Sequence, residues 1–324
     1  MRMRKQKLKA KNSSKFNIFL FEFATCGEKL DDSITIEGFA MFKSYYNGFN
    51  KISNVRAFVR EEFSYLNLPV LSVEKIEEEL ERSDAFLIIA PEDDLILYKL
   101  TKIGEKHCYN LGSSSKAIKI TSDKWRLYKK LKGKVRIPRT SKRPISENQI
   151  IKPRISCGGS GIKFSRWRPE NYIFQEYIRG MPLSVSLLIS DAIYPVSVNE
   201  QIIENFRYYG AVVPARISSE ISSEVISEAI TAAESIRGLN GYVGVDLVFS
   251  EDPYVIEINA RPTTPSILFE FTHGISSAEL IWRSQTGNLV LPRPKNRYRL
   301  HKRENSCDRV YASYGKYKLC IEEL

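Results

Sequence analysis

Apolar runs and helix-period segments alternate along the first third of the chain. The runs 16–21 and 84–90 are almost continuously apolar, which is typical of strands covered on both faces. Between them, residues 34–46 repeat apolar side chains at helical spacing, and residues 73–82 are acidic and helix-prone. Strand and helix alternate in this way to about residue 115, and the pattern predicts a small parallel α/β lobe.

The hydrophobic pattern changes beyond this lobe. Ser122 and Asp123 can cap a short helix that Gly133 terminates. From 134 to 200 the apolar runs are short and are separated by glycine and proline, as in small antiparallel sheets. Residues 222–237 then repeat apolar side chains on one face and predict a long helix.

Two strand runs, 242–249 and 254–258, predict an antiparallel pair around a two-residue turn. In that register Asp246 lies directly opposite Glu257, with Cβ atoms roughly 4.5–5.5 Å apart. Asn259 leaves the same strand face as Glu257, because side chains alternate along a strand. Two carboxylates and an amide oxygen suit Mg²⁺, or Mn²⁺ as the alternative, with phosphate and water completing the shell. Three polar residues on the wet face of a sheet would give the same pattern.

Two further segments offer positive charge and backbone donors. Arg261 shares the face of Asn259 if the strand continues, and a guanidinium binds phosphate oxygens bidentately. Lys152 precedes a glycine-rich segment containing Gly158, Gly159 and Gly161, whose backbone N–H groups can close over an anion. The segment is not a P-loop, because it lacks the GxxxxGK[ST] spacing. A glycine-rich hairpin turn without a ligand is the alternative.

The strand run 172–178 enters a linker, where extended backbone could hydrogen-bond an adenine edge. An ordinary strand end would have the same sequence. Lys124 lies inside the helix capped at Ser122 and Asp123, and by itself it is typical of a solvated lysine. By itself neither feature indicates a function; only their order along the chain, together with the other segments, does so.

The net charge of +11 is concentrated at the two ends of the chain. Residues 1–15 carry +7 and residues 293–303 carry +6, so the remainder carries −2. We expect both segments to be solvated tails. The alternative is a nucleic-acid-binding protein, whose binding should be abolished by removal of residues 1–15. The near-neutral body argues against that class, and no nucleic-acid partner is expected.

The composition is that of a globular protein, with 43% apolar and 27% charged residues among 324. We find no apolar run of the roughly 18–20 residues that a membrane span requires, and no signal-peptide pattern, so we expect a cytoplasmic protein. The five cysteines are scattered, odd in number and without CxxC spacing, which predicts free structural thiols. Neither pattern nor composition indicates the oligomeric state.

Taken in this order, the segments resemble an ATP-grasp enzyme, over residues 16 to about 285. The residues that carry the resemblance are Asp123-Lys124, Ile151-Lys152-Pro153, the glycine-rich segment, Gln175–Ile178, Gly244-Val245-Asp246-Leu247 and Glu257-Ile258-Asn259-Ala260-Arg261. The resemblance implies a mixed α/β and α+β fold, in which two α+β subdomains clamp ATP behind an N-terminal Rossmann-like lobe. The implied segments are a basic tail (1–15), a pre-ATP-grasp lobe (16–115), an ATP-grasp domain (116–290) with a flexible small subdomain at about 134–180, and a basic C-terminal segment (291–324).

The resemblance also implies roles for the matched residues. Lys124 and Lys152 would bind the ATP phosphates beneath a flap formed by Gly158, Gly159 and Gly161. Nucleotide contacts would further come from Gln175, Glu176, Tyr177, Ile178 and Ser184, with Glu176 to Ile178 at the adenine. Asp246, Glu257 and Asn259 would ligate Mg²⁺, and Arg261 would act with Lys152 in catalysis by stabilising an acyl phosphate.

Two positions depart from the family pattern. Ala260 stands where the family usually has proline, which loosens the loop after Asn259 without removing a ligand. The stretch 181–184 lacks the glutamate that holds the ribose in many members, so the ribose contact stays open.

A narrower resemblance rests on segments outside the nucleotide motifs. These segments are Phe21-Glu22-Phe23-Ala24, Ala90-Pro91-Glu92-Asp93, Asn110–Ser114, Leu183–Leu187 and Gly238–Asp246. They are similar to the archaeal tyramine–L-glutamate ligases of methanofuran biosynthesis. The similarity implies an ADP-forming acid–amine ligase that joins the γ-carboxylate of L-glutamate to tyramine. An ATP-grasp ligase for another amino acid, amine or peptide stays open, as does a nucleotide-binding regulator without turnover.

Overall fold

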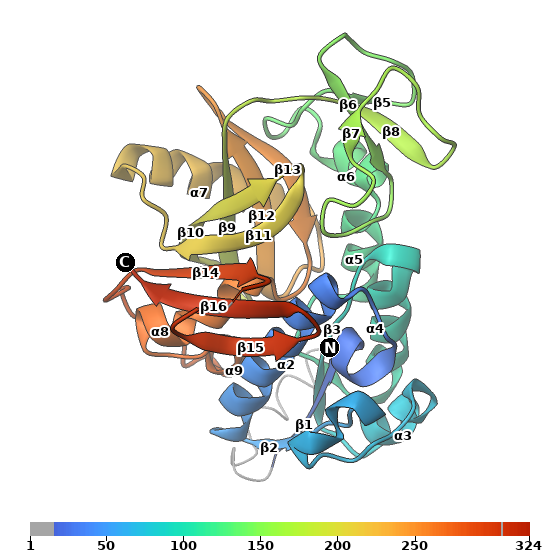
Figure 1. The fold of residues 1–324 in the computed structure, drawn as a ribbon, viewed down its shortest axis with the longest axis vertical. Coiled ribbons are helices and arrows are strands. Elements are labelled where there is room, and N and C mark those ends of the chain that lie inside the picture. The colour runs from blue at the N-terminus through green and yellow to red at the C-terminus, as the bar shows by residue number, and fades with distance from the viewer. Residues whose placement is uncertain (1–15, 306) are drawn as a thin grey trace.

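The computed structural model describes residues 16–305 and 307–324, which form three β-sheets with helices packed around them (Figure 1). The predicted tail at 1–15 lies outside the described residues. One sheet belongs to the N-terminal lobe, a small sheet caps the molecule, and a large antiparallel sheet lies between them.

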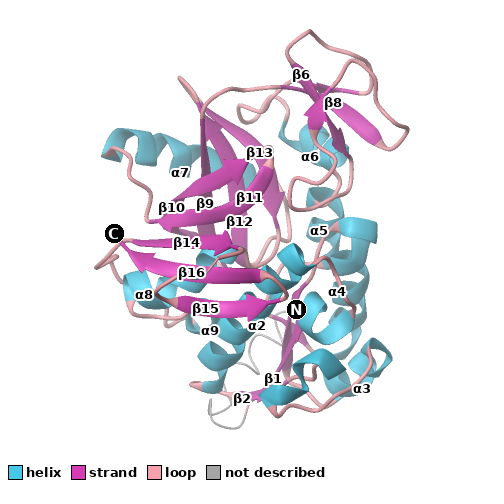
Figure 2. Ribbon diagram, viewed as in Figure 1, coloured by secondary structure: helices cyan, strands magenta, loops and turns pink. Residues whose placement is uncertain are grey.

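The N-terminal lobe is the predicted parallel α/β unit. Its sheet has the order β2-β1-β3-β4 with every neighbouring pair parallel. Figure 2 shows α2 on one side of these strands and α3 and α4 on the other. The elements are β1 (Asn17–Glu22), α2 (Asp32–Asn50), β2 (Asn54–Arg56), α3 (Ile76–Glu81), β3 (Ala85–Ile89), α4 (Ile96–His107) and β4 (Tyr109–Asn110), with short helical turns at Phe23–Gly27, Glu61–Leu66, Val73–Lys75 and Asp93–Leu95.

The small sheet and two helices follow in the chain. Asp123 caps the second helix by accepting hydrogen bonds from the backbone N–H groups of Trp125 and Arg126. The sheet order is β5-β8-β6-β7, with all pairs antiparallel. The elements are α5 (Ser115–Thr121), α6 (Lys124–Leu131), β5 (Thr140–Ser141), β6 (Gln149–Pro153), β7 (Lys163–Phe164) and β8 (Tyr172–Glu176).

The large sheet has the order β13-β12-β9-β10-β11-β14-β16-β15 and is antiparallel throughout. Its central strands are apolar and buried, and α7 packs across β13, β10 and β12. The elements are β9 (Met181–Ile189), β10 (Ile193–Glu204), β11 (Arg207–Val213), α7 (Ser219–Glu234), β12 (Gly241–Phe249), β13 (Pro253–Asn259), a 3₁₀ turn (Thr264–Leu268), α8 (Phe269–His273), α9 (Ser277–Thr286), β14 (Tyr298–Arg303), β15 (Val310–Tyr314) and β16 (Tyr317–Glu323).

The expectation of a solvated basic tail at 293–303 was wrong. Residues 298–303 form β14, which lies inside the large sheet between β11 and β16. Tyr298, Leu300 and Lys302 share one face of the strand and are all buried, whereas the opposite face carries Arg299, the buried His301 and the exposed Arg303. A count of charges over the segment does not indicate that alternate residues are buried in a strand.

The prediction that all five cysteines are free was also wrong. Cys307 and Cys320 form a disulfide that joins β16 to the segment after β14. Cys26, Cys108 and Cys157 are not disulfide-bonded, as predicted. Within the described ranges, no helix combines the length and apolar character needed to cross a membrane.

Candidate active site

A cavity of about 590 Å³ opens where the three sheets meet. Its walls come from α2 and β1 of the N-terminal lobe, from the small sheet and its glycine-rich loop, and from the face of the large sheet. The residues predicted for the site that line it are Lys124, Lys152, Gly158, Gly159, Gln175, Glu176, Tyr177, Ile178, Ser184, Asp246, Glu257, Asn259 and Arg261. Gly161 is the predicted residue that does not line the cavity; it packs near Pro153 and Tyr172.

The carboxylate cluster, formed by Asp246, Glu257 and Asn259, lies on β12 and β13. Asp246 pairs with Glu257 across the strands, as predicted, but the predicted two-residue turn was wrong. The turn spans the three residues 250–252, and a bulge at Ile256 restores the register that a two-residue turn would have given. The bulge therefore decides that Glu257, and not a neighbouring residue, lies opposite Asp246.

The cluster is a compact oxygen-rich site. Asn259 Nδ2 and Gln201 Nε2 each donate to a different Asp246 oxygen at 2.9 Å. Burial raises the pKa of Asp246 to about 7, and the negative charge of Glu257 adds to that rise. Burial also disfavours the charged form of Glu257, but the positive charges of Lys124 and Lys152 outweigh it and lower the Glu257 pKa.

Two lysines bring positive charge to these carboxylates. Lys124 begins α6; its Nζ lies 3.6 Å from Glu257 Oε2 and donates to the carbonyl oxygen of Ser156 at 2.7 Å. Lys152 lies on β6 and is 5% exposed. Burial lowers the Lys152 pKa to about 8, although Glu257 opposes that change. The solvated-lysine alternative for Lys124 is therefore excluded, since its side chain is 9% exposed.

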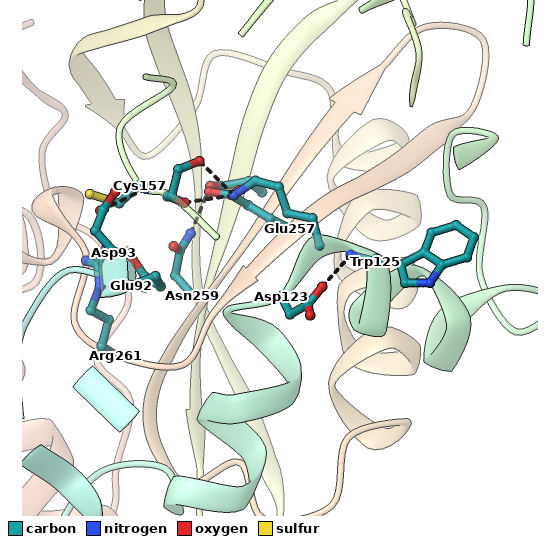
Figure 3. A network of polar contacts seen from close by, with 11 residues as sticks. Glu92, Asp93, Asp123, Trp125, Cys157, Glu257, Asn259 and Arg261 are labelled. Atoms are coloured by element: carbon teal, nitrogen blue, oxygen red, sulfur yellow. Dashed lines mark hydrogen bonds and ion pairs between the residues drawn. The ribbon is translucent and has the colours of Figure 1, made fainter. Parts of the chain in front are cut away.

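The glycine-rich loop lies against the large sheet. Gly159 has φ +75°, and a Cβ there would collide with the carbonyl oxygen of Phe206, which lies in the turn between β10 and β11. At the start of the loop, Cys157 N–H donates to Asp93 Oδ2 of the N-terminal lobe at 3.2 Å (Figure 3). The loop thus contacts both walls of the cavity.

Known proteins resemble this chain over most of its length. The family model described as the ATP-grasp domain matches residues 121–265, and the pre ATP-grasp 3 domain matches residues 68–118. A tyramine–L-glutamate ligase of Methanocaldococcus fervens is 40% identical over 262 aligned residues, covering 76% of this chain and 87% of the relative. The chain belongs to the ATP-grasp family.

Solved structures share the ATP-grasp fold of this chain. A crystal structure described as an ATP-grasp superfamily protein from Archaeoglobus fulgidus has a TM-score of 0.90 at 53% identity, covering 96% of this chain and 100% of that one. The ADP complex of an N5-carboxyaminoimidazole ribonucleotide synthetase has a TM-score of 0.64 at 16% identity, covering 90% of this chain and 81% of that one. The fold predicted from the sequence is confirmed.

The ATP-grasp hinge predicted at Gln175–Ile178 begins with the last two residues of β8 and lines the cavity. Gln175 is buried and donates through Nε2 to Thr140 Oγ1 at 3.0 Å, so its side chain is committed to the small sheet. Tyr177 meets the rings of Phe164 and Phe206 edge-on. These aromatic contacts connect the hinge, the small sheet and the β10–β11 turn.

Arg261 lines the cavity, but it does not lie on a continuation of the strand, as the sequence had predicted. The strand ends at Asn259, and the guanidinium turns toward the N-terminal lobe, where it makes two bonds to the Glu92 carboxylate at 2.8 and 2.9 Å (Figure 3). Burial disfavours the Arg261 charge, but Glu92 more than compensates and raises the Arg261 pKa. Glu92 and Gln201 are site residues that sequence reasoning missed; for Glu92 the only signal was the motif 90–93.

In the described part of the chain, no group of three or more His, Cys, Asp or Glu side chains is arranged to hold a metal ion. The carboxylate cluster offers two carboxylates and one amide. Such a set fits Mg²⁺ bound jointly with nucleotide phosphate, because Mg²⁺ usually keeps several water and phosphate oxygens rather than an all-protein cage. Assignment of the individual ligands remains a prediction.

Proposed function

We propose that this chain is an ATP-dependent carboxylate–amine ligase that joins the γ-carboxylate of L-glutamate to tyramine, releasing ADP and phosphate. The observation that carries the proposal is the 40% identity to a tyramine–L-glutamate ligase over 87% of that enzyme. The cavity supports it, because lysines, paired carboxylates and an arginine line one space that also reaches the N-terminal lobe.

ATP would lie between the small sheet and the large sheet. The hinge residues Glu176 to Ile178 would hold the adenine, and Lys124 and Lys152 would contact the phosphates. The carboxylate cluster would hold Mg²⁺, which when bound supplies positive charge beside the transferred phosphoryl group. The chain's own contribution is positioning and charge, which supply most of the catalysis in phosphoryl transfer.

The first step forms an acyl phosphate. An oxygen of the substrate carboxylate attacks the γ-phosphorus, a new P–O bond forms, and the bond between the γ-phosphorus and the ADP oxygen breaks. The attack brings anions together and is unfavourable until Lys124, Lys152 and Arg261 reduce their repulsion. Arg261, held in place by Glu92, would face the new acyl phosphate.

The second step forms the amide. The neutral amine attacks the carbonyl carbon, a C–N bond forms, the C–O bond to phosphate breaks, and the amine's extra proton leaves on the phosphate. The tetrahedral oxyanion needs a donor, for which Arg261 is our candidate. The loop of Gly158 and Gly159, seated against Phe206, would keep water from the acyl phosphate.

We further propose that the functional units follow the segments 16–115 and 116–290, with 134–180 as the part that moves over the nucleotide. The residues 291–324 would belong to the second unit, because β14 to β16 continue its sheet.

The test is mass spectrometry of the full chain with Mg-ATP, L-glutamate and tyramine, with ADP measured in parallel. We expect γ-glutamyltyramine, identified by fragmentation, in equal amount to ADP. ADP formed only with other acids or amines would retain the ligase and reject this substrate pair. No ADP with any acid and amine would overturn the proposal.

A further inference from the structure

The cavity extends past the carboxylate cluster to a wall formed by α2, β11 and β14. From α2, Ile34, Glu37, Gly38 and Met41 line it, at spacings of three and four that place them on one helix face. Lys302 of β14 and Tyr208 of β11 line the same region. None of these residues belongs to the nucleotide motifs.

The Glu37 carboxylate can accept more hydrogen bonds than the protein gives it. Its Oε1 accepts from Lys302 Nζ at 2.6 Å, and its Oε2 accepts from Thr264 Oγ1 at 2.9 Å. Each carboxylate oxygen can accept two hydrogen bonds, so Glu37 can accept further donors. Lys302 also donates to the carbonyl and hydroxyl oxygens of Ser33, so all three of its protons are directed at protein acceptors. The lysine fixes Glu37 in place and balances its charge.

Tyr208 supplies a hydroxyl that the protein itself does not satisfy. Its Oη is buried and lacks a hydrogen-bond partner among the described residues, yet the side chain lines the cavity. Burial raises the Tyr208 pKa well above its ordinary value, and the charges of Glu37 and Asp246 add to the rise. The hydroxyl therefore stays protonated and can act as a hydrogen-bond donor. A buried donor of this kind is costly unless a ligand oxygen accepts from it.

The other acidic side chains of this cavity are engaged elsewhere. Glu22 accepts three hydrogen bonds from the turn that follows β1. Asp31 caps α2, Glu304 pairs with Lys316, and Glu176 belongs to the hinge. The carboxylate cluster faces the two phosphate-binding lysines. Glu37 is thus the carboxylate of the described cavity wall that is placed to receive a cation from the substrate.

We propose that Glu37 and Tyr208 form the subsite for the amino-acid substrate. Glu37 binds the α-ammonium group, Tyr208 Oη donates to a carboxylate oxygen, and the side-chain carboxylate extends toward the carboxylate cluster, where phosphoryl transfer occurs. This inference rests on the proposed function and assigns the substrate specificity of that site to α2 and β11.

The experiment compares Glu37→Gln and Tyr208→Phe with the wild-type chain in steady-state kinetics. L-glutamate, tyramine and Mg-ATP are varied in turn, and glutarate, which lacks the α-ammonium group, replaces glutamate in a parallel series. Glu37→Gln should raise KM for glutamate by about 10- to 100-fold, since a hydrogen bond to a charged group is lost. The preference for glutamate over glutarate should fall by a similar factor, while KM for tyramine and Mg-ATP stays within about threefold.

Tyr208→Phe is the second variant because it removes a hydroxyl that has no hydrogen-bond partner among the described residues, and so should leave the fold intact. We expect its KM for glutamate to rise by about 3- to 10-fold. Matched controls are Glu270→Gln, which lies on α8 and pairs with Lys51, and Tyr65→Phe, which is exposed. Both controls should match the wild type.

The outcomes separate the subsite from the proposed function. A wild-type chain that forms no glutamyltyramine rejects the function itself. An active wild type whose preference for glutamate over glutarate is unchanged in Glu37→Gln overturns the subsite alone. An equal rise in KM for tyramine would also overturn it, because Glu37 would then serve the amine.

Discussion

At the scale of single residues, Asp246 and Glu257 face each other yet carry opposite pKa shifts. Burial and the charge of Glu257 raise the pKa of Asp246 to about 7. The positive charges of Lys124 and Lys152 lower the pKa of Glu257. Glu257 is therefore the fixed negative charge of the cluster, and Lys124 and Lys152 gather around it. Removing that charge should disturb both the metal binding and the phosphate binding that we propose for this cluster and its lysines.

We expect Glu257→Gln to reduce kcat on the order of 100-fold or more, because a charged ligand beside the transferred phosphoryl group becomes neutral. The near-isosteric amide should leave the fold intact. The measurement is ADP release with glutamate and tyramine, together with thermal unfolding. Glu251→Gln, in the exposed turn of the same hairpin, is the control. Near wild-type turnover in Glu257→Gln would refute the metal assignment.

At the scale of elements, the three C-terminal strands, β14 to β16, form one end of the large sheet and also part of the cavity wall. β14 pairs with β11 and brings Lys302 to Glu37, while β16 pairs with β14 along its whole length. The disulfide between Cys307 and Cys320 closes a short loop, with a sequence separation of 13, between the segment after β14 and β16. A cross-link of this length restricts the unfolded chain.

Cys307→Ser should lower the free energy of unfolding by about 3 kcal/mol or less, the value expected for closing a loop of this size. Chemical denaturation of oxidised wild type and variant measures the difference. The difference should disappear when both proteins are unfolded with reductant present. Cys26→Ser, at a buried thiol outside the disulfide, is the comparison for loss of a sulfur atom without loss of the cross-link. Equal stability of the oxidised proteins would show that the cross-link does not contribute.

At the scale of the whole molecule, the cavity exists only because three sheets meet. Its wall includes residues from Glu22 in β1 to Tyr317 in β16, so elements far apart in the sequence contribute to it. The ion pair between Arg261 and Glu92 ties the large sheet to the N-terminal lobe, and the glycine-rich loop contacts both. The two basic ends of the chain should therefore differ in their effect on folding and on activity.

A chain that ends at Leu291 should fail to fold or should aggregate, because it loses β14 to β16 and leaves the β11 edge unpaired. Deletion of residues 1–15 should leave ligase activity unchanged, because the described cavity is lined by residues 22–317. Soluble expression, circular dichroism and ADP release measure both truncations. Loss of activity in the N-terminal deletion would give the basic tail a role in function, and a folded C-terminal truncation would contradict the importance of β14.

The sequence by itself determined the features that depend on neighbours along the chain. The alternation of strands and helices predicted the parallel lobe, and the strand period placed Asp246 opposite Glu257 and Asn259 on the same face. Even there the turn length was wrong and a bulge compensated for it. Local periodicity is readable because side-chain direction repeats every two residues in a strand and every 3.6 in a helix.

The tertiary structure alone decided which distant residues meet. Arg261 and Glu92 are 169 residues apart, and Lys302 and Glu37 are 265 apart. The Tyr208 hydroxyl has no hydrogen-bond partner among the described residues, and its side chain lines the same cavity as Glu37 of α2. No spacing rule relates such residues, because their contacts arise from the packing of separate sheets. The pairing of Asp246 with Glu257 could therefore be predicted from the sequence, whereas the contacts of Arg261 and Glu37 became visible only in the folded chain.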